Sequence, residues 1–303
     1  MTAWILSHEP ALRLGSFGFV LVAMALWEIL ARRRELSQSR PKRWFANLGI
    51  SVIDSFLVRL LFPAAAVGLS VVAESEGWGL LNRIDVPFAL AVVISVIVFD
   101  LVIYLQHVMF HAVPALWRFH MVHHSDEDID LTTGIRFHPV EIALSIVVKF
   151  VVVAALGPPP VAVLVFAVVL NATSMFNHGN VRLPLGIDAW LRWILVTPDM
   201  HRVHHSVELD ESNSNFGFNL PWWDRLFGTY RAQPRAGHEA MRLGVEDLLQ
   251  PQARGLVNLL MLPFVRASDR TALSARGASE KPSSALSLRA NESREHGSER
   301  INE

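Results

Sequence analysis

The chain has 303 residues and a formal net charge of −1, and its 18% of charged residues is below the roughly 25% of an ordinary soluble domain. The hydrophobic share is 51% and the mean hydropathy is +0.33, because long apolar runs replace the missing charge. These values exclude a disordered chain and, without a surplus of Lys and Arg, a nucleic-acid-binding protein; they indicate a membrane protein.

Three apolar runs in the first third of the chain predict membrane helices, at residues 16–31, 47–73 and 86–106. A basic cluster follows the first run and no small-residue cleavage site is present, which favours a retained anchor over a signal peptide. The second run is long enough to cross a bilayer with tilt, and we expect its charged residues Asp54 and Arg59 to face protein or the interface.

The fourth apolar region, residues 140–176, is interrupted by Gly157 and the three prolines that follow it. Proline cannot continue a helix, so this region predicts a helical hairpin. Each arm has about 16 residues, slightly short for a full span, so a tilted or re-entrant hairpin is an alternative.

The Lys and Arg residues after the first run place that segment in the cytoplasm. With the runs alternating in direction, residues 107–138 and 178–205 then lie on the same, cytoplasmic face. We therefore expect an all-α, multi-pass transmembrane bundle of about four to five membrane helices, including the hairpin, with a cytoplasmic histidine-rich cap that binds two metals.

The same pattern divides the chain into four parts. We expect N-terminal membrane helices and a loop in residues 1–85, a catalytic domain in 86–235, a C-terminal extension in 236–265 and a disordered tail in 266–303. The tail is rich in Ser, Arg and Glu and has little apolar surface to bury.

Ten of the 13 histidines lie between positions 107 and 205, and the chain has no cysteine, so a metal would have to be bound by nitrogen and oxygen. Eight of the ten form three clusters with helical spacing: His107 and His111; His120, His123 and His124; and His201, His204 and His205.

Residues three or four apart share one face of a helix, whereas adjacent residues point about 100° apart. Adjacent histidines such as His123 and His124 are therefore able to serve two different metals. Eight imidazoles also exceed what one metal uses, which predicts two metals. His138 and His178, at the ends of apolar segments on the same face, are candidates for a ninth and a tenth ligand.

Redox-active iron fits these clusters better than hydrolytic zinc, because Val108 stands where the HExxH zinc box has its glutamate. Two irons beside a bilayer are suited to activating O₂ for attack on an unactivated C–H bond of a lipid. We expect no catalytic residue beyond the metal ligands. Acidic residues flank the clusters, Glu141 among them, and the candidates to support the ligands are Asp100, Tyr104, Asp199 and Asn215.

The motifs between residues 92 and 230 resemble the fatty acid hydroxylase superfamily, also called the sterol desaturase family, of integral membrane non-haem di-iron oxygenases. The resemblance rests on Asp100 and Tyr104 before the first pair, Trp117–His120 opening the second cluster, His138-Pro139, Asn177-His178, Thr197-Pro198 and the closing segment Trp223–Tyr230. It implies that the eight clustered histidines are ligands, supports His178 and, less directly, His138, and implies two Fe ions and O₂ as cofactors.

Such a protein hydroxylates or desaturates a lipid of the sterol, fatty acyl, ether lipid or carotenoid class. It would take its electrons from a separate reductase, cytochrome or ferredoxin. The alternatives are a non-catalytic membrane metal-binding protein, for sensing or storage, and a haem-binding cytochrome. A haem would need isolated axial histidines that face each other across helices, which this spacing does not provide.

Overall fold

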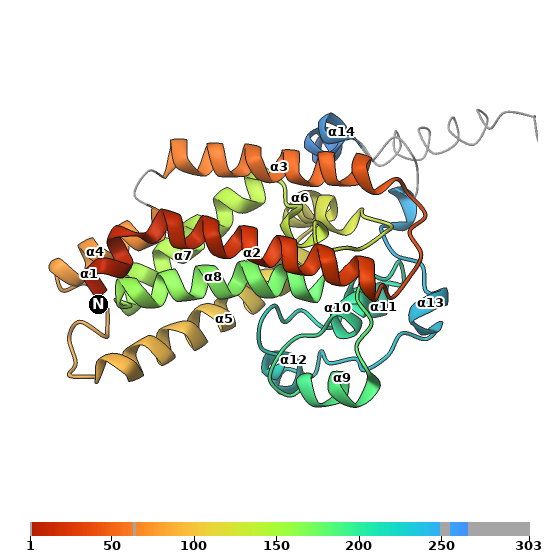
Figure 1. Ribbon diagram of the computed structural model, residues 1–303. Coiled ribbons are helices and arrows are strands. Elements are labelled where there is room, and N and C mark those ends of the chain that lie inside the picture. The colour runs from red at the N-terminus through yellow and green to blue at the C-terminus, as the bar shows by residue number, and fades with distance from the viewer. Residues whose placement is uncertain (1, 63–64, 249–254, 266–303) are drawn as a thin grey trace, which may run out of the picture.

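The computed structural model describes residues 2–62, 65–248 and 255–265, and within these ranges the chain forms helices and loops without a β-strand (Figure 1). The expected disordered tail, 266–303, lies outside the described residues. The long helices are α2 (Glu9–Leu30), α3 (Arg40–Leu61), α4 (Ala65–Ser75), α5 (Phe88–Ala112), α7 (Pro139–Leu156) and α8 (Pro160–Asn177).

Five stretches of the described chain are long and apolar enough to cross a membrane, which confirms the multi-pass helical bundle. They are α2, the region Arg40–Ser75, α5, α7 and α8. The expectation of one continuous helix over 47–73 was wrong in detail, because α3 ends at Leu61 and α4 begins at Ala65. Pro63 disfavours a helical conformation at Phe62, the residue before it, and Phe62 has left the helical region at φ −133° and ψ 65°.

The predicted hairpin is formed by α7 and α8. Gly157 caps α7 in the left-handed conformation with φ +66°, which favours glycine, and Pro160 begins α8 at a position where a missing N–H costs no hydrogen bond. The short connection makes the two helices antiparallel neighbours.

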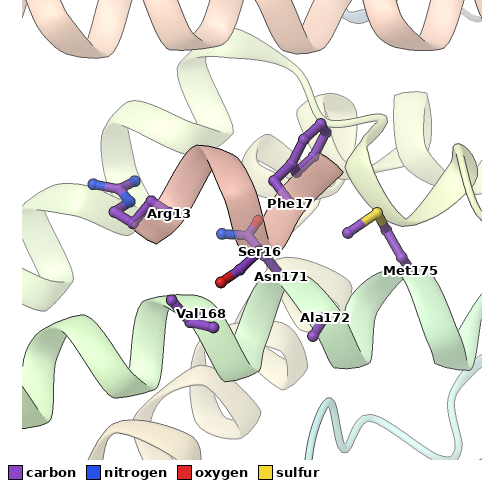
Figure 2. Close-up of a pocket in the computed structure, with 7 residues that line it drawn as sticks. All are labelled: Arg13, Ser16, Phe17, Val168, Asn171, Ala172 and Met175. Atoms are coloured by element: carbon purple, nitrogen blue, oxygen red, sulfur yellow. The ribbon is translucent and has the colours of Figure 1, made fainter. Parts of the chain in front are cut away.

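Helix α8 lies at the centre of the bundle and packs against α2, α4 and α5, while α7 packs against α3 and α4. Figure 2 shows the seam where Arg13, Ser16 and Phe17 of α2 lie opposite α8. The crevice between them, next to Asn171 and Met175, has a volume of about 10 Å³, which is room for little more than one water molecule.

Shorter helices gather at one end of the long ones and form a cap (Figure 1). They are α6 (Pro114–His124), η1 (Thr133–Ile135), α9 (Leu185–Leu191), α10 (Pro198–His204), α11 (Leu209–Ser212), α12 (Trp222–Leu226), α13 (Gly237–Ala240), η2 (Glu246–Leu248), α14 (Leu256–Met261) and η4 (Leu262–Phe264); α1 (Thr2–Ser7) precedes α2.

Buried charged side chains of α2 and α3 bind to the cap. Glu28 of α2 is fully buried and accepts hydrogen bonds from the backbone N–H groups of Leu131 (2.7 Å) and Asn180 (2.9 Å). Arg43 of α3 forms ion pairs with Asp126 (2.8 Å) and Asp130 (2.7 Å). Buried charges are tolerated only with such partners, so these contacts fix where the segment after α6 meets the membrane helices.

Candidate metal centre

Prolines and helix ends position the clustered histidines. His107 and His111 lie in the last two turns of α5, and Pro114 at the start of α6 turns the chain so that the next cluster follows within one short helix. Helix α10 begins at Pro198, and the Thr197 side chain caps it by accepting a hydrogen bond from the Met200 N–H (3.3 Å).

The structure brings nine histidines together in two adjacent groups. The first group is His107, His111, His120, His124 and His204, and the second is His123, His178, His201 and His205. Within each group one nitrogen per residue lies within 4.8 Å of the others. Adjacent residues fall into different groups, His123 apart from His124 and His204 apart from His205, as the 100° offset between neighbours requires.

Backbone carbonyls and one carboxylate hold the outer nitrogens of five of these rings. The Nδ1 atoms of His107, His123, His178 and His204 contact the carbonyl oxygens of Phe216 (2.7 Å), Arg136 (3.2 Å), Ser174 (2.8 Å) and Ser214 (2.8 Å), respectively. The Nδ1 of His120 contacts Oε1 of Glu141 at 2.7 Å. Since a backbone carbonyl oxygen only accepts, Nδ1 carries the proton in four of these rings, and in His120 it does so with the ionised carboxylate of Glu141 as acceptor. The Nε2 of each neutral ring then presents a lone pair.

These lone pairs face one another. Nε2 of His107 lies 3.1 Å from Nε2 of His120, and Nε2 of His123 lies 3.0 Å from Nε2 of His178. Two lone pairs at this distance repel unless a cation lies between them. The inner nitrogens therefore fit metal ions, one in each group, and imidazole ligands suit iron as well as zinc, copper and nickel.

Burial keeps these rings neutral. It lowers the pKa of His120 and of His178 to about 3, and it also lowers the pKa values of His124, His201 and His205 well below the ordinary value, with neighbouring histidines adding to the effect. Neutral imidazole is the form that binds a metal, so the centre is prepared for metal at neutral pH.

His138 lies outside both groups, so the structure does not support the expectation that it is a ligand. Its Nδ1 accepts a hydrogen bond from the Val140 N–H (3.2 Å) as the N-cap of α7, and its Nε2 lies 3.1 Å from the carbonyl oxygen of Leu260. One ring nitrogen thus caps α7 and the other joins this helix to the C-terminal segment.

No side chain of the four supporting candidates hydrogen-bonds to a clustered histidine ring, and only the backbone of Asn215 approaches one, that of His201. Asp100 accepts from Asn219 (2.7 Å) and Trp223 (2.8 Å), and the Tyr104 hydroxyl bonds to Thr229 (2.9 Å), so both join α5 to the cap. Their role is in the packing of the cap.

The other two candidates also act within the cap. Asp199 pairs with Arg33 and Arg202, and the side chain of Asn215 bonds to the backbone of Met200 and Arg231. Sequence analysis placed Glu141 only among the flanking acidic residues and did not single it out. Its position two residues after Pro139, in the first turn of α7, was the available signal.

A cavity of about 730 Å³ reaches this centre from inside the membrane bundle. His107 and His120 line one end, and residues near the start of α2, including Arg13, line the other. A volume of this size is in the range of small-molecule binding sites. The cavity therefore gives a bound molecule access to the histidine centre from within the bundle.

The segment that carries the histidine centre is similar to known proteins. A model of the fatty acid hydroxylase family matches residues 92–229, the segment that contains all nine grouped histidines. The chain is 32% identical to ornithine lipid hydroxylase OlsE of Rhizobium tropici over 180 residues, which are 59% of this chain and 52% of that protein.

Two further relatives are more distant. Alkylglycerol monooxygenase of Xenopus tropicalis is 29% identical over 61% of this chain and 41% of its own, and cholesterol 25-hydroxylase of Rattus norvegicus is 31% identical over 48% of each. The chain thus spans about half or less of the length of these relatives. No solved structure matches it.

Proposed function

Residues 92–229 of this chain belong to the fatty acid hydroxylase family, and from this premise we propose that the protein is a membrane-bound di-iron oxidoreductase that uses O₂ to hydroxylate a lipid. The observation that carries the proposal is the pair of adjacent all-histidine groups at the end of a cavity that opens into the membrane bundle. A metal store would need the histidines but not a cavity of this size leading to them.

The chain's own residues would hold the irons, orient the ligand rings and line the cavity. His107, His111, His120, His124 and His204 would hold one iron, and His123, His178, His201 and His205 the other. Bound irons would supply O₂ activation and the removal of hydrogen from an unactivated carbon.

Around them, Glu141 and the backbone carbonyls orient the rings. Apolar side chains of α5 and α8, among them Phe99 and Phe166, line the cavity and exclude water from the substrate.

The names of the relatives, two hydroxylases and a monooxygenase, favour hydroxylation over desaturation. Electrons would come from a separate reductase, cytochrome or ferredoxin. The basic cluster after α2 supports a cytoplasmic position for the centre, where such a donor has access.

The test is metal content and product together, on protein purified in detergent with iron supplied and chelators avoided. We expect about two irons per chain, as two separate ligand groups require, and a lipid product with one added oxygen when a reductant is present. His124→Ala should lose iron and all turnover, because His124 belongs to one group and is next in sequence to a member of the other.

His8→Ala is the matched control, because His8 lies at the start of α2 and its side chain hydrogen-bonds only to Ser7 and Trp4 among the described residues. Exchangeable, variable metal loading with no lipid product would contradict the enzyme and favour a metal-binding protein.

A further inference from the structure

The cavity has one polar and one apolar wall. Helix α7 contributes Glu141, Ser145 and Lys149, which are four residues apart and therefore share one face of the helix, and α3 contributes Ser51 and Asp54. The opposite wall, from α5 and α8, is mainly apolar, with side chains such as Ile103, Val163 and Leu170, and its polar residues include Gln106 and Asn171. An ordinary hydrocarbon chain would leave the polar wall without partners.

Asp54 is a buried acidic residue on that wall whose side chain lacks a full set of partners. Its side chain is only 7% exposed, and its Oδ1 has no hydrogen-bond partner. The carboxyl group of Glu141, which contacts His120 through Oε1, is close enough to act on Asp54 electrostatically, and no ion pair to Asp54 forms among residues 2–62, 65–248 and 255–265. A buried carboxylate that has no cation paired to it, inside a membrane bundle, is costly unless a ligand supplies the positive charge.

Lys149 is a basic residue of the cavity that has no acidic partner among the described residues. It lines the same cavity eight residues beyond Glu141, which is about 12 Å along the helix axis. In the part of the chain that the structure describes, no carboxylate pairs with it, and the charge that acts on it is that of Arg13. Arg59 lines the cavity as well, and so does Glu9, which forms an ion pair with Arg13. The cavity is therefore acidic near the histidine centre and mainly basic farther from it.

From this arrangement, and building on the function proposed above, we propose that the substrate is a lipid whose polar group carries both an ammonium and an anionic group. The ammonium binds Asp54 and the anion, a carboxylate or a phosphate, binds Lys149. A hydroxyl would satisfy the hydrogen bond of Asp54 but not its charge, so a sterol or a neutral glycerol ether is the poorer complement. The apolar wall covers the hydrocarbon part of the molecule.

The experiment measures binding to the full chain in detergent, with three probes. N-palmitoyl-lysine carries a free ammonium and a carboxylate, its Nε-acetyl derivative lacks the ammonium charge, and palmitoyl glycerol is neutral. We expect the acetylated probe to bind at least about tenfold more weakly than N-palmitoyl-lysine, a difference of about 1.4 kcal/mol, because its amide N–H donates a hydrogen bond but carries no charge to pair with Asp54.

Asp54→Asn should remove that preference, so that N-palmitoyl-lysine and its acetylated derivative bind with similar affinity. Asp210→Asn is the matched control, since Asp210 lies on the cap surface and pairs with Arg231 and Arg235, and it should keep the preference. Lys149→Met should weaken the binding of N-palmitoyl-lysine but not the binding of N-palmitoyl-cadaverine, which has the ammonium and no carboxylate.

Equal affinities of wild-type protein for the free and the acetylated amine would overturn the inference, as would an unchanged preference in Asp54→Asn. Because binding is measured without turnover, a result that contradicts the lipid preference does not contradict the proposed activity, and a result that contradicts the activity does not contradict the preference. An amine preference without any oxidised lipid leaves this inference standing and removes the proposed activity, whereas oxidation of neutral lipids without an amine preference does the reverse.

Discussion

Glu141 is a residue whose single contact matters to the whole centre. Its carboxylate, 4% exposed, accepts a hydrogen bond from Nδ1 of His120 and so fixes which nitrogen of that ring faces the other histidines. A carboxylate in this place also makes the ring a stronger ligand, because it stabilises the positive charge that the imidazole acquires when it binds a metal.

Glu141→Gln should therefore lower iron affinity by about 10-fold to 100-fold, the usual cost of losing such a partner. The amide still accepts a hydrogen bond, so folding should be retained. The measurement is iron retention against a graded series of chelator concentrations, read alongside the optical spectrum of the iron-loaded protein. Glu246→Gln, which changes a carboxylate paired with Arg242 on the surface, should bind iron like the wild type, and an equal loss in both variants would count against the positioning role.

At this scale the sequence predicts which histidines converge better than it predicts what surrounds them. Helical spacing alone groups the eight clustered residues, and His178 joins them because α8 ends beside α10. The carbonyl partners include those of Phe216 and Ser214, which lie in the loop after α11, and no side-chain pattern marks a carbonyl. Asp100 fails as a partner of a ligand for the same reason, since its contacts are set by how the cap folds onto α5.

At the scale of elements, apolar runs and breaking residues determine most of what can be predicted. The hairpin of α7 and α8 follows from Gly157 and its prolines, while the exact start of α2 and the separation of α3 from α4 depend on local conformation near Glu9 and Phe62. The close approach of η1 to α8 is not visible in the sequence. A β-carbon on Gly134 would lie 2.3 Å from the carbonyl oxygen of Ser174, which is the acceptor for His178.

Gly134→Ala should consequently displace that carbonyl and weaken the second histidine group more than the first. We expect the variant to fold with a loss of about 1–3 kcal/mol, the usual cost of overpacking, and to bind about one iron in place of two. Elemental analysis and thermal unfolding of the purified protein measure both effects. Gly18→Ala, at a helical position with open space around its β-carbon, should retain both irons; full iron content in Gly134→Ala would show that the contact is dispensable.

At the scale of the whole molecule, the two histidine groups connect α5, α6, α8 and α10. Removing the metals leaves facing lone pairs at about 3 Å, so the metal-free protein should be less stable and should depend more strongly on pH. Protonation sets the direction of that dependence. The folded-state pKa values of His120 and His178, about 3, lie below the ordinary 6.5, so only the unfolded chain takes up these protons between those two values.

The stability of the metal-free protein should therefore be complete above about pH 6.5 and fall as the pH decreases, by about 1.4 kcal/mol per pH unit for each such histidine. Thermal unfolding of chelator-treated protein between pH 7.5 and pH 5 gives the slope. Iron-loaded protein is the comparison and should show a smaller slope, because bound metal competes with protons for the same nitrogens. A metal-free protein that becomes more stable on acidification would contradict this assignment of neutral rings.

The contacts of Glu28 bear on how the protein is made. Its two backbone partners, Leu131 and Asn180, lie 103 and 152 residues farther along the chain. At about 5–20 residues per second, the ribosome needs roughly 8–30 s after synthesising Glu28 to complete this set of partners. During that interval α2 holds a carboxylate that lacks the two backbone partners it has in the finished fold. The final position of α2 in the bilayer therefore depends on the hairpin, which is translated later. A helix translated early is thus among the last to reach its final packing.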